Sequence, residues 1–326
     1  MANEVLETTR YVLENPQFVK IDGLRVLQLA KEWVEEEFTL PTWDIPVYPE
    51  GKTNEVIDYF LLNDSINFAF TDFTTKEKFT AEYEGKPWRG ALGMTGCLKK
   101  AIDSGVPLLD AGFLQEITRP QMEQIFRGNI EIPMLDERLE IFHEVGKVLE
   151  KKYDGHFYNL VEASNNRLFN RGTGMVERLV NDFPSFDDAA QYKGRRIVFN
   201  KRAQLASGMI YERFEGDLKI DDIDDITIFL DYVIPKGLRD KGTLVYEESL
   251  ARRVDNQEII YPGSMEEVEI RSSAAHVANE LIESINLYRE PENLPPINAL
   301  HMDAKLWLNS RSKEGKPHHL TPTIAY

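Results

Sequence analysis

One carboxylate in this sequence stands out because of its apolar surroundings. Asp231 lies in the run 226–235, in which nearly all other positions are apolar or aromatic. Buried acids are rare unless they are paired or functional. The run therefore predicts either a catalytic carboxylate or one that caps a helix or accepts structural hydrogen bonds. The acidic stretch 221–225 just upstream lacks this setting, and we expect it to form a solvated loop.

A second carboxylate, Asp303, precedes Trp307 by four residues, a spacing that places two side chains on one face of a helix. A carboxylate beside an indole can hold a flat heterocycle. A tryptophan packed in the core with an acid at its rim has the same spacing, and the local sequence favours that interpretation.

Two pairs of basic residues are candidates for binding. Lys201 and Arg202 lie off the apolar face of a helix predicted over 200–214, which favours solvated surface, with a phosphate contact as the alternative. His318 and His319 belong to an extended tail. Adjacent side chains rarely chelate one ion and no third ligand is obvious, so we expect these histidines to bond to the backbone or to a ligand. No metal site is predicted.

The sequence lacks several common binding and catalytic motifs. The triplet 51–53, Gly-Lys-Thr, resembles the end of a phosphate-binding loop, but Pro46 stands where its first glycine would be required. Gly90, Gly93 and Gly96 have the wrong spacing for a dinucleotide fingerprint, and we expect them to permit close packing at the start of a helix. The chain has no Gly-x-Ser-x-Gly or His-Glu-x-x-His motif.

Composition narrows the class of protein and of partner. The 326 residues include 38 basic and 55 acidic side chains, which give a formal net charge of -17 and favour a small ligand over a nucleic-acid polymer. The single cysteine, Cys97, excludes an intrachain disulfide and a thiolate zinc site. Neither a signal-peptide core nor an apolar run of about 18 residues is present. We therefore expect a cytoplasmic protein that does not bind membranes.

The elements that must position these side chains are mainly helical. Hydrophobic periodicity predicts helices over 22–37, 91–104, 120–128, 136–152, 173–182, 200–214, 264–287 and 297–310. Strand-like stretches at 66–70 and 79–83, the latter followed by a turn at 84–86, are expected to pair. The sequence thus predicts a mainly α fold with a small antiparallel β element in the N-terminal third.

The chain also resembles the queuosine salvage protein family, the queuosine 5'-phosphate N-glycosidases/hydrolases. The matching blocks begin near residue 20 and continue to the C-terminus, and their order and spacing are specific although each is short. They are Asn67-Phe68-Ala69-Phe70, Ile132-Pro133-Met134-Leu135, Phe183-Pro184-Ser185-Phe186, Phe199-Asn200-Lys201-Arg202-Ala203-Gln204, Phe229-Leu230-Asp231-Tyr232, Glu267-Val268-Glu269-Ile270-Arg271, Leu306-Trp307 and the tail from Pro317-His318-His319 to Ala325-Tyr326.

This resemblance implies a helical fold related to helix-hairpin-helix DNA glycosylases and a reaction in which water releases the base queuine from queuosine 5'-monophosphate. It implies no metal or redox cofactor. The family's catalytic aspartate falls on Asp231 and its base-stacking aromatic on Phe229. A base-recognising acid falls on Asp303, with Ala304 beside it.

The remaining candidates for substrate binding follow from chemistry. Tyr232 would add to the apolar rim around the catalytic acid, Trp307 would lie beside the base, and Lys201 and His319 would contact the 5'-phosphate. We expect no obligate protein partner. The whole chain, 1–326, would form a single domain, with the small sheet in a part over about 1–90 and a helical catalytic part over about 91–326.

The sequence departs from the family pattern at several positions. The family usually has Trp where Thr71 stands, a histidine near 45–47 that is missing here, a Leu-Gly-Ala-Leu stretch where 241–244 reads Lys-Gly-Thr-Leu, and Arg where Leu320 and Pro322 stand. These differences concern the details of the substrate more than the reaction. Two alternatives stay open, a DNA or RNA base glycosylase and a nucleoside-binding protein without catalysis.

Overall fold

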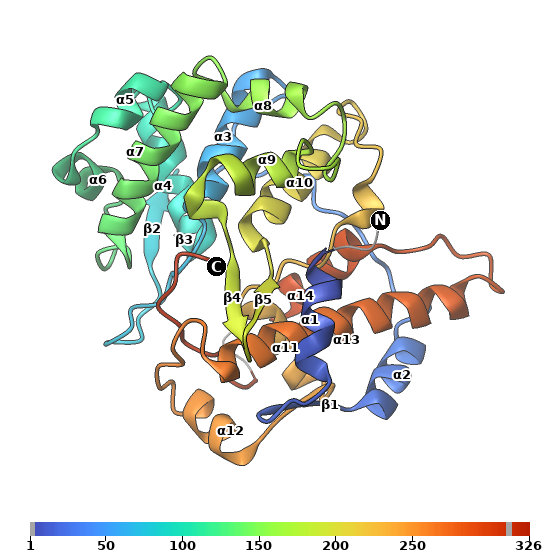
Figure 1. Ribbon diagram of the computed structural model, residues 1–326. Coiled ribbons are helices and arrows are strands. Elements are labelled where there is room, and N and C mark those ends of the chain that lie inside the picture. The colour runs from blue at the N-terminus through green and yellow to red at the C-terminus, as the bar shows by residue number, and fades with distance from the viewer. Residues whose placement is uncertain (1–3, 311–314) are drawn as a thin grey trace. The chain divides into compact units, whose positions relative to one another are not determined.

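Helices dominate the computed structural model, which describes residues 4–310 and 315–326 (Figure 1). The strands in these ranges form antiparallel pairs, so the mainly α prediction is confirmed. The chain divides into two units that alternate along the sequence. Unit 1 comprises Met1–Leu40, Ala189–Lys201 and Asp224–Pro322, and unit 2 comprises Pro41–Asp188, Arg202–Ile223 and Thr323–Tyr326. The expectation of a single domain stays a prediction.

The long helix α13, Met265–Arg289, forms the centre of unit 1. Its start is capped by the side chain of Ser264, which accepts a hydrogen bond from the backbone N–H of Glu267 at 3.3 Å. Much of its circumference is buried because other elements surround it. These elements are α1 (Glu4–Leu13), α2 (Gly23–Glu32), α11 (Val233–Asp240), α14 (Ala299–Ser310) and β1 (Val19–Ile21).

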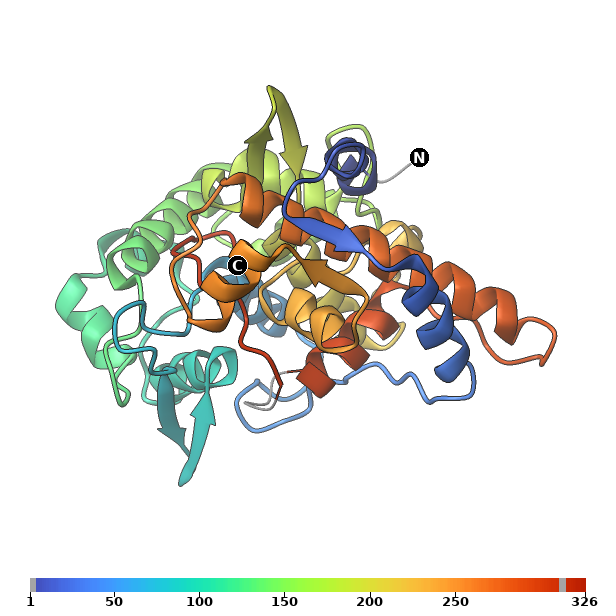
Figure 2. The ribbon, with the colours of Figure 1, turned by 90° about the horizontal axis from the view of Figure 1, so that it is seen from below.

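Unit 1 also contains two short strand pairs, which Figure 2 shows from below. Strand β1 pairs with β6 (Leu244–Tyr246), and β4 (Ala189–Tyr192) pairs with β5 (Arg195–Val198) in a hairpin. Helix α12 (Glu248–Asp255) follows β6. The sequence did not indicate these pairs because strands of three or four residues are too short to show alternation.

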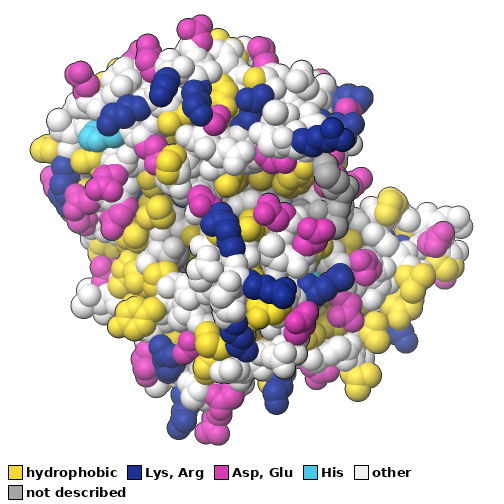
Figure 3. Space-filling view, in the orientation of Figure 1, with side chains coloured by type: hydrophobic (Ala, Val, Ile, Leu, Met, Phe, Trp, Pro, Cys, Tyr) yellow, Lys and Arg dark blue, Asp and Glu magenta, His cyan; other side chains and the backbone are white. Residues whose placement is uncertain are grey.

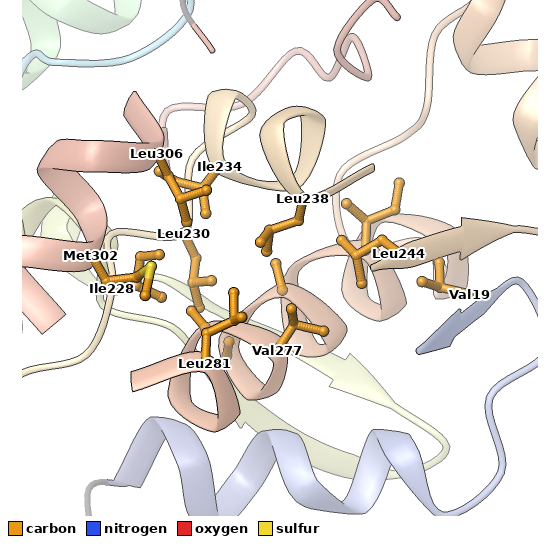
Figure 4. Packing of buried hydrophobic residues seen from close by; sticks show 14 of the residues in the cluster. Val19, Ile228, Leu230, Ile234, Leu238, Leu244, Val277, Leu281, Met302 and Leu306 are labelled. Atoms are coloured by element: carbon orange, nitrogen blue, oxygen red, sulfur yellow. The ribbon is translucent and has the colours of Figure 1, made fainter. Parts of the chain in front are cut away.

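The hydrophobic core of unit 1 holds the segments that carry the candidate acids. Figure 4 shows Ile228 and Leu230, from the run around Asp231, packed among buried side chains of α11, α13 and α14. Leu230 is fully buried, as are Leu281 from α13 and Met302 from α14. The run is therefore anchored in the core on both sides of its acid, since residues 226–230 and 233–235 are buried.

Unit 2 has helices α3 (Asn54–Ser65), α4 (Ala91–Asp103), α5 (Ala111–Glu116), α6 (Arg119–Ile125), α7 (Leu135–Lys152), α8 (Phe157–Ala163) and α9 (Met175–Asp182), together with most of α10 (Lys201–Phe214). The β2–β3 hairpin (Thr80–Tyr83, Lys86–Arg89) packs against α4. A short 3-10 helix, η1 (Pro184–Phe186), follows α9, and a second, η2 (Ile223–Asp225), lies at the passage into unit 1.

The predicted pairing of 66–70 with 79–83 is confirmed only at its edge, where the backbone N–H of Phe79 donates to the carbonyl oxygen of Phe70 at 2.8 Å beside an antiparallel bridge between Thr71 and Lys78. The rest of the pairing is wrong, because 80–83 forms a small antiparallel hairpin with 86–89 instead. Residues 66–70 do not form a strand because the guanidinium of Arg138 in α7 forms hydrogen bonds with three of their carbonyl groups. Its guanidinium donates to the carbonyl oxygens of Ile66 and Phe68, and to that of Ala69 at 2.9 Å. Ala69 also has a φ of 43°, which is incompatible with a strand.

The acidic stretch 221–225 also differs in part from expectation. Asp222 is buried and accepts hydrogen bonds from the backbone N–H groups of Leu168 at 2.8 Å and Phe169 at 3.0 Å. It therefore closes a loop within unit 2 instead of facing solvent.

Candidate functional site

Asp231 lies at the start of α11, and its side chain caps that helix. Its Oδ1 accepts hydrogen bonds from the backbone N–H groups of Val233 at 2.7 Å and Ile234 at 3.0 Å. Negative charge is stabilised at a helix N-terminus by such N–H groups. Asp231 therefore does cap a helix, which was one of the two interpretations of this acid. Both cap hydrogen bonds end on the same carboxylate oxygen.

The backbone before Asp231 is equally fixed. The N–H of Asp231 donates to the carbonyl oxygen of Phe229 at 2.7 Å, which makes a tight turn. Phe229 and Leu230 are buried, whereas Asp231 and Tyr232 are half-buried. The turn thus places the carboxylate at the edge of the core and not within it.

Asp303 of α14 is joined to the same turn. Its Oδ1 accepts a hydrogen bond from the backbone N–H of Phe229 at 2.9 Å. Burial raises the pKa of Asp303 well above its usual range, and the negative charge of Asp231 raises it further. The Phe229 hydrogen bond and the charge of Lys201 act in the opposite direction. Asp303 therefore holds its proton to a higher pH than a solvated carboxyl group does.

Lys201 is the first residue of α10 and lies in unit 1. Its side chain is buried, with 4% exposed, and its charge acts on the carboxyl group of Asp303. The favoured interpretation of Lys201 and Arg202 as solvated surface is therefore wrong. Arg202 is 1% exposed and belongs to unit 2, where it donates to the carbonyl oxygens of Ser65 and Ser185.

The C-terminal tail brings two histidines toward this region of unit 1. The ring of His318 lies against that of Tyr232, with centroids 4.3 Å apart. His318 Nδ1 lies 2.7 Å from the carbonyl oxygen of His319, and because a carbonyl only accepts, Nδ1 carries the proton. The backbone N–H of Ile260 donates to the carbonyl of Leu320 at 2.9 Å and holds the tail in place.

His319 is buried, and this decides its charge. Burial lowers its pKa to about 3, and electrostatic interactions with His318 and Arg271 contribute to the shift. The imidazole of His319 is therefore neutral at physiological pH. It can offer an N–H group to an anion but no positive charge.

Two further candidates lie on α14. Ala304 is buried, and Trp307 is half-buried and packs against the core of unit 1. This is the arrangement that the local sequence favours for Asp303 and Trp307, a tryptophan packed on the core and an acid nearby. It leaves a role of Trp307 in binding a base as a prediction.

Arg271 has no role assigned by the sequence, yet it contacts this site. It lies in the second turn of α13, and its Nε donates to the carbonyl oxygen of Leu230 at 3.1 Å. A signal was available, since Glu267 and Arg271 are oppositely charged and lie one helical turn apart.

Neither a metal cluster nor a membrane-spanning helix is found where the chain is described. Over residues 4–310 and 315–326, no three His, Cys, Asp or Glu side chains are grouped so that they could hold a metal ion. Within the same ranges, no helix combines the length and the apolar character needed to cross a bilayer.

Comparison with known proteins gives a consistent result. The sequence model of one family, described as queuosine salvage protein, matches residues 47–326. A relative from Sphaerobacter thermophilus named queuosine 5'-phosphate N-glycosylase/hydrolase is 36% identical over 326 residues, which cover 99% of this chain and 97% of the relative. Relatives of the same name from Mus musculus and Schizosaccharomyces pombe are 32% and 27% identical, covering 98% and 94% of this chain and 98% and 90% of their own.

Proposed function

Because this chain belongs to the queuosine salvage protein family, we propose that it hydrolyses the N-glycosidic bond of queuosine 5'-monophosphate and releases queuine, which is then available for salvage into tRNA. The names of its relatives support the reaction and the substrate class. The observation in the structure that supports it best is the pair of interacting carboxyl groups, Asp231 and Asp303, at one tight turn.

Asp231 is the proposed catalytic carboxylate. Cleavage of an N-glycoside builds positive charge at C1' as the base departs, and a negative charge beside that carbon stabilises this state. The half-buried position at the edge of an apolar core strengthens the interaction, because the surrounding dielectric constant is low. The same carboxylate would act either electrostatically or as a nucleophile.

The base would be held by the residues around the turn. Queuine is a 7-deazaguanine and has no N7 to protonate, so the enzyme must act through the ribose and the pyrimidine edge of the base. Asp303 would accept hydrogen bonds from the ring N1–H and the exocyclic amine, which favours its ionised form once the base is bound. Phe229 would stack on the base, which contributes roughly 1–3 kcal/mol in stacking sites.

The other positions surround this arrangement. Tyr232 would form the apolar rim, and Ala304 and Trp307 of α14 would line the base side. Lys201 would supply positive charge to the 5'-phosphate, and His319 would supply at most a neutral N–H donor. No metal or redox cofactor enters this proposal.

The proposal extends to the fold of the protein and its location in the cell. We place the chain among folds related to helix-hairpin-helix DNA glycosylases, as a single domain acting in the cytoplasm without an obligate partner. A polymer glycosylase is the weaker alternative, since it requires a continuous basic surface. Figure 3 shows acidic and basic side chains interspersed over the face in view, and the net charge is -17.

The test is to incubate the full chain with queuosine 5'-monophosphate and to measure queuine by mass spectrometry. The Asp231→Asn variant serves as the comparison, because asparagine can still accept the two helix-cap hydrogen bonds. Absence of queuine with the wild-type chain would overturn the proposed reaction. Undiminished release by the variant would overturn only the role of Asp231.

A further inference from the structure

The guanidinium of Arg271 is buried, and its positive charge must therefore be balanced by the groups around it. Its side chain is 2% exposed and lies in α13 at the core of unit 1. Its Nη1 lies 3.4 Å from Oε1 of Glu267, one helical turn earlier, and this carboxylate is 3% exposed. Glu267 also accepts a hydrogen bond from the backbone N–H of Gly263 at 3.1 Å. The acid is thereby fixed and in turn fixes the arginine.

Arg271 holds the backbone directly before Asp231. Its Nε donates to the carbonyl oxygen of Leu230, which belongs to the peptide unit joining Leu230 to Asp231. The N–H of that same peptide donates to Phe229. Both polar ends of the plane are therefore occupied, and the plane cannot rotate without breaking one of these bonds. The orientation of this peptide plane helps to set the direction in which the side chain of Asp231 leaves the backbone. Arg271 therefore fixes the orientation of the carboxylate.

The flat face of the same guanidinium packs on a second segment. Arg271 Cζ lies 3.9 Å from the ring centroid of Phe199. Phe199 precedes Lys201 by two residues, and Asn200 between them has a left-handed φ of 51°, which turns the chain into α10. One side chain thus contacts both segments that carry charged groups of the proposed site.

We propose that Arg271, held by Glu267, is a positioning residue that aligns Asp231 and Lys201 for the reaction. Each of its contacts uses a different feature of arginine: Nε reaches the carbonyl, Nη1 reaches Glu267 and the planar face lies on Phe199. Lysine keeps the charge but cannot make all three contacts. This inference rests on the proposed function, because it assigns Arg271 to that reaction.

The test compares Arg271→Lys with a matched control, Arg239→Lys. Arg239 is likewise a buried arginine of unit 1, bonded to Asp255 at 2.7 and 3.1 Å and lying 4.6 Å from the ring centroid of Tyr246. It sits at the opposite end of α11 from Asp231. Both substitutions remove a buried guanidinium from its ion pair and should lower stability, although Asp255 is itself 46% exposed, so stability alone does not separate them.

The expected difference lies in catalysis. A misplacement of about 1 Å can cost on the order of 100-fold in rate, so we expect Arg271→Lys to lower kcat by about that factor. KM for queuosine 5'-monophosphate should rise by less than about tenfold, because Lys201 is displaced but keeps its charge. Arg239→Lys should keep the wild-type kcat per folded molecule. Glu267→Gln, which retains the shape of the acid without its charge, should fall between wild type and Arg271→Lys and serves as the second variant if Arg271→Lys does not fold.

The outcomes are distinguishable. If wild type releases no queuine, the proposed function fails and this inference fails with it. If wild type is active, and Arg271→Lys, or Glu267→Gln in its place, keeps a wild-type kcat, the reaction stands and the positioning role is overturned. An equal loss of kcat in Arg239→Lys would also overturn it, since the effect would then be one of general stability.

Discussion

The backbone N–H of Phe229 donates a hydrogen bond of 2.9 Å to Oδ1 of Asp303. This bond joins the residue proposed to stack on the base to the acid proposed to recognise its edge. The two groups are therefore set by one contact between a turn and α14. Their position relative to Asp231 is fixed as well, because Asp231 lies two residues farther along the same turn.

Asp303 should make the stability of the protein depend on pH. A carboxyl group whose pKa is raised in the folded state stabilises the fold below its unfolded pKa, about 4, and this contribution is lost as pH rises through the folded pKa. We expect wild type to lose stability over that window relative to Asp303→Asn, with a slope of at most about 1.4 kcal/mol per pH unit. Urea unfolding at a series of pH values measures it.

The control for this titration is Glu248→Gln, which removes an exposed acid of α12. It should leave the pH dependence of wild type unchanged. Parallel profiles for wild type and Asp303→Asn would show that Asp303 ionises normally in the folded protein.

Binding of queuine should release a proton from Asp303. Donors on the base edge favour the ionised carboxyl, so a group that is protonated in the free protein loses its proton in the complex. We expect proton release of up to one per site at a pH below the raised pKa, measured by calorimetry in buffers with different ionisation enthalpies. Asp303→Asn should bind queuine more weakly and release no proton, and equal proton release by that variant would exclude Asp303 as the source.

Asp231 should contribute to stability and to activity through separable features. Asp231→Ala removes the acceptor for Val233 and Ile234 and should cost about 1 kcal/mol of unfolding free energy, whereas Asp231→Asn keeps an acceptor and should cost less. Both variants should lose roughly 100-fold or more in kcat, because each lacks the negative charge. Activity that follows stability across the two variants would argue for a purely structural acid.

Lys201 should matter for the phosphate more than for the base. We expect Lys201→Met to raise KM for queuosine 5'-monophosphate at least about tenfold, with a smaller effect on unphosphorylated queuosine, because a charge-assisted contact of roughly 1.5–3 kcal/mol is lost. Steady-state kinetics with both substrates measure the difference.

Lys305→Met provides the comparison for Lys201. Lys305 is a largely covered lysine of α14 that pairs with Glu36 and lies 5.4 Å from the ring centroid of Trp33. Its replacement should leave the ratio between the two substrates unchanged. An equal rise in KM for both substrates with Lys201→Met would place the phosphate elsewhere.

The helices with a clear apolar stripe could be predicted from sequence, and α3 shows why others could not. Residues 56–65 of α3 are buried on every side, including Asp58 and Asp64, so no polar face marks the period of the helix. Periodicity reports burial on one face only, and it fails where a helix is enclosed.

The errors in the remaining predictions share a different cause, which is a contact between residues distant in sequence. The stretch 66–70 has strand-like side chains, but Arg138 binds its carbonyl groups. Lys201 lies off an apolar face and is nevertheless covered. Asp303 is indicated by its spacing from Trp307 and by the family resemblance, while Arg271 lies within a matching block and has no role assigned from the sequence. Helical spacing indicates the local partner of Arg271, which is Glu267. It does not indicate the long-range contacts of Asp303 with Phe229 or of Arg271 with Leu230.

The pairing of β1 with β6 has a consequence for the order in which the protein can be made. Val19 lies opposite Tyr246 in this pair, so the edge of β1 has no strand partner until most of the chain has left the ribosome. Helix α13, on which α1 and β1 also pack, comes later still. During synthesis the N-terminal segment of unit 1 therefore emerges before the strand with which it pairs and the helix on which it packs. Long-range pairing of this kind slows folding and exposes intermediates to aggregation, which makes the emerging N-terminal segment a natural client for chaperones.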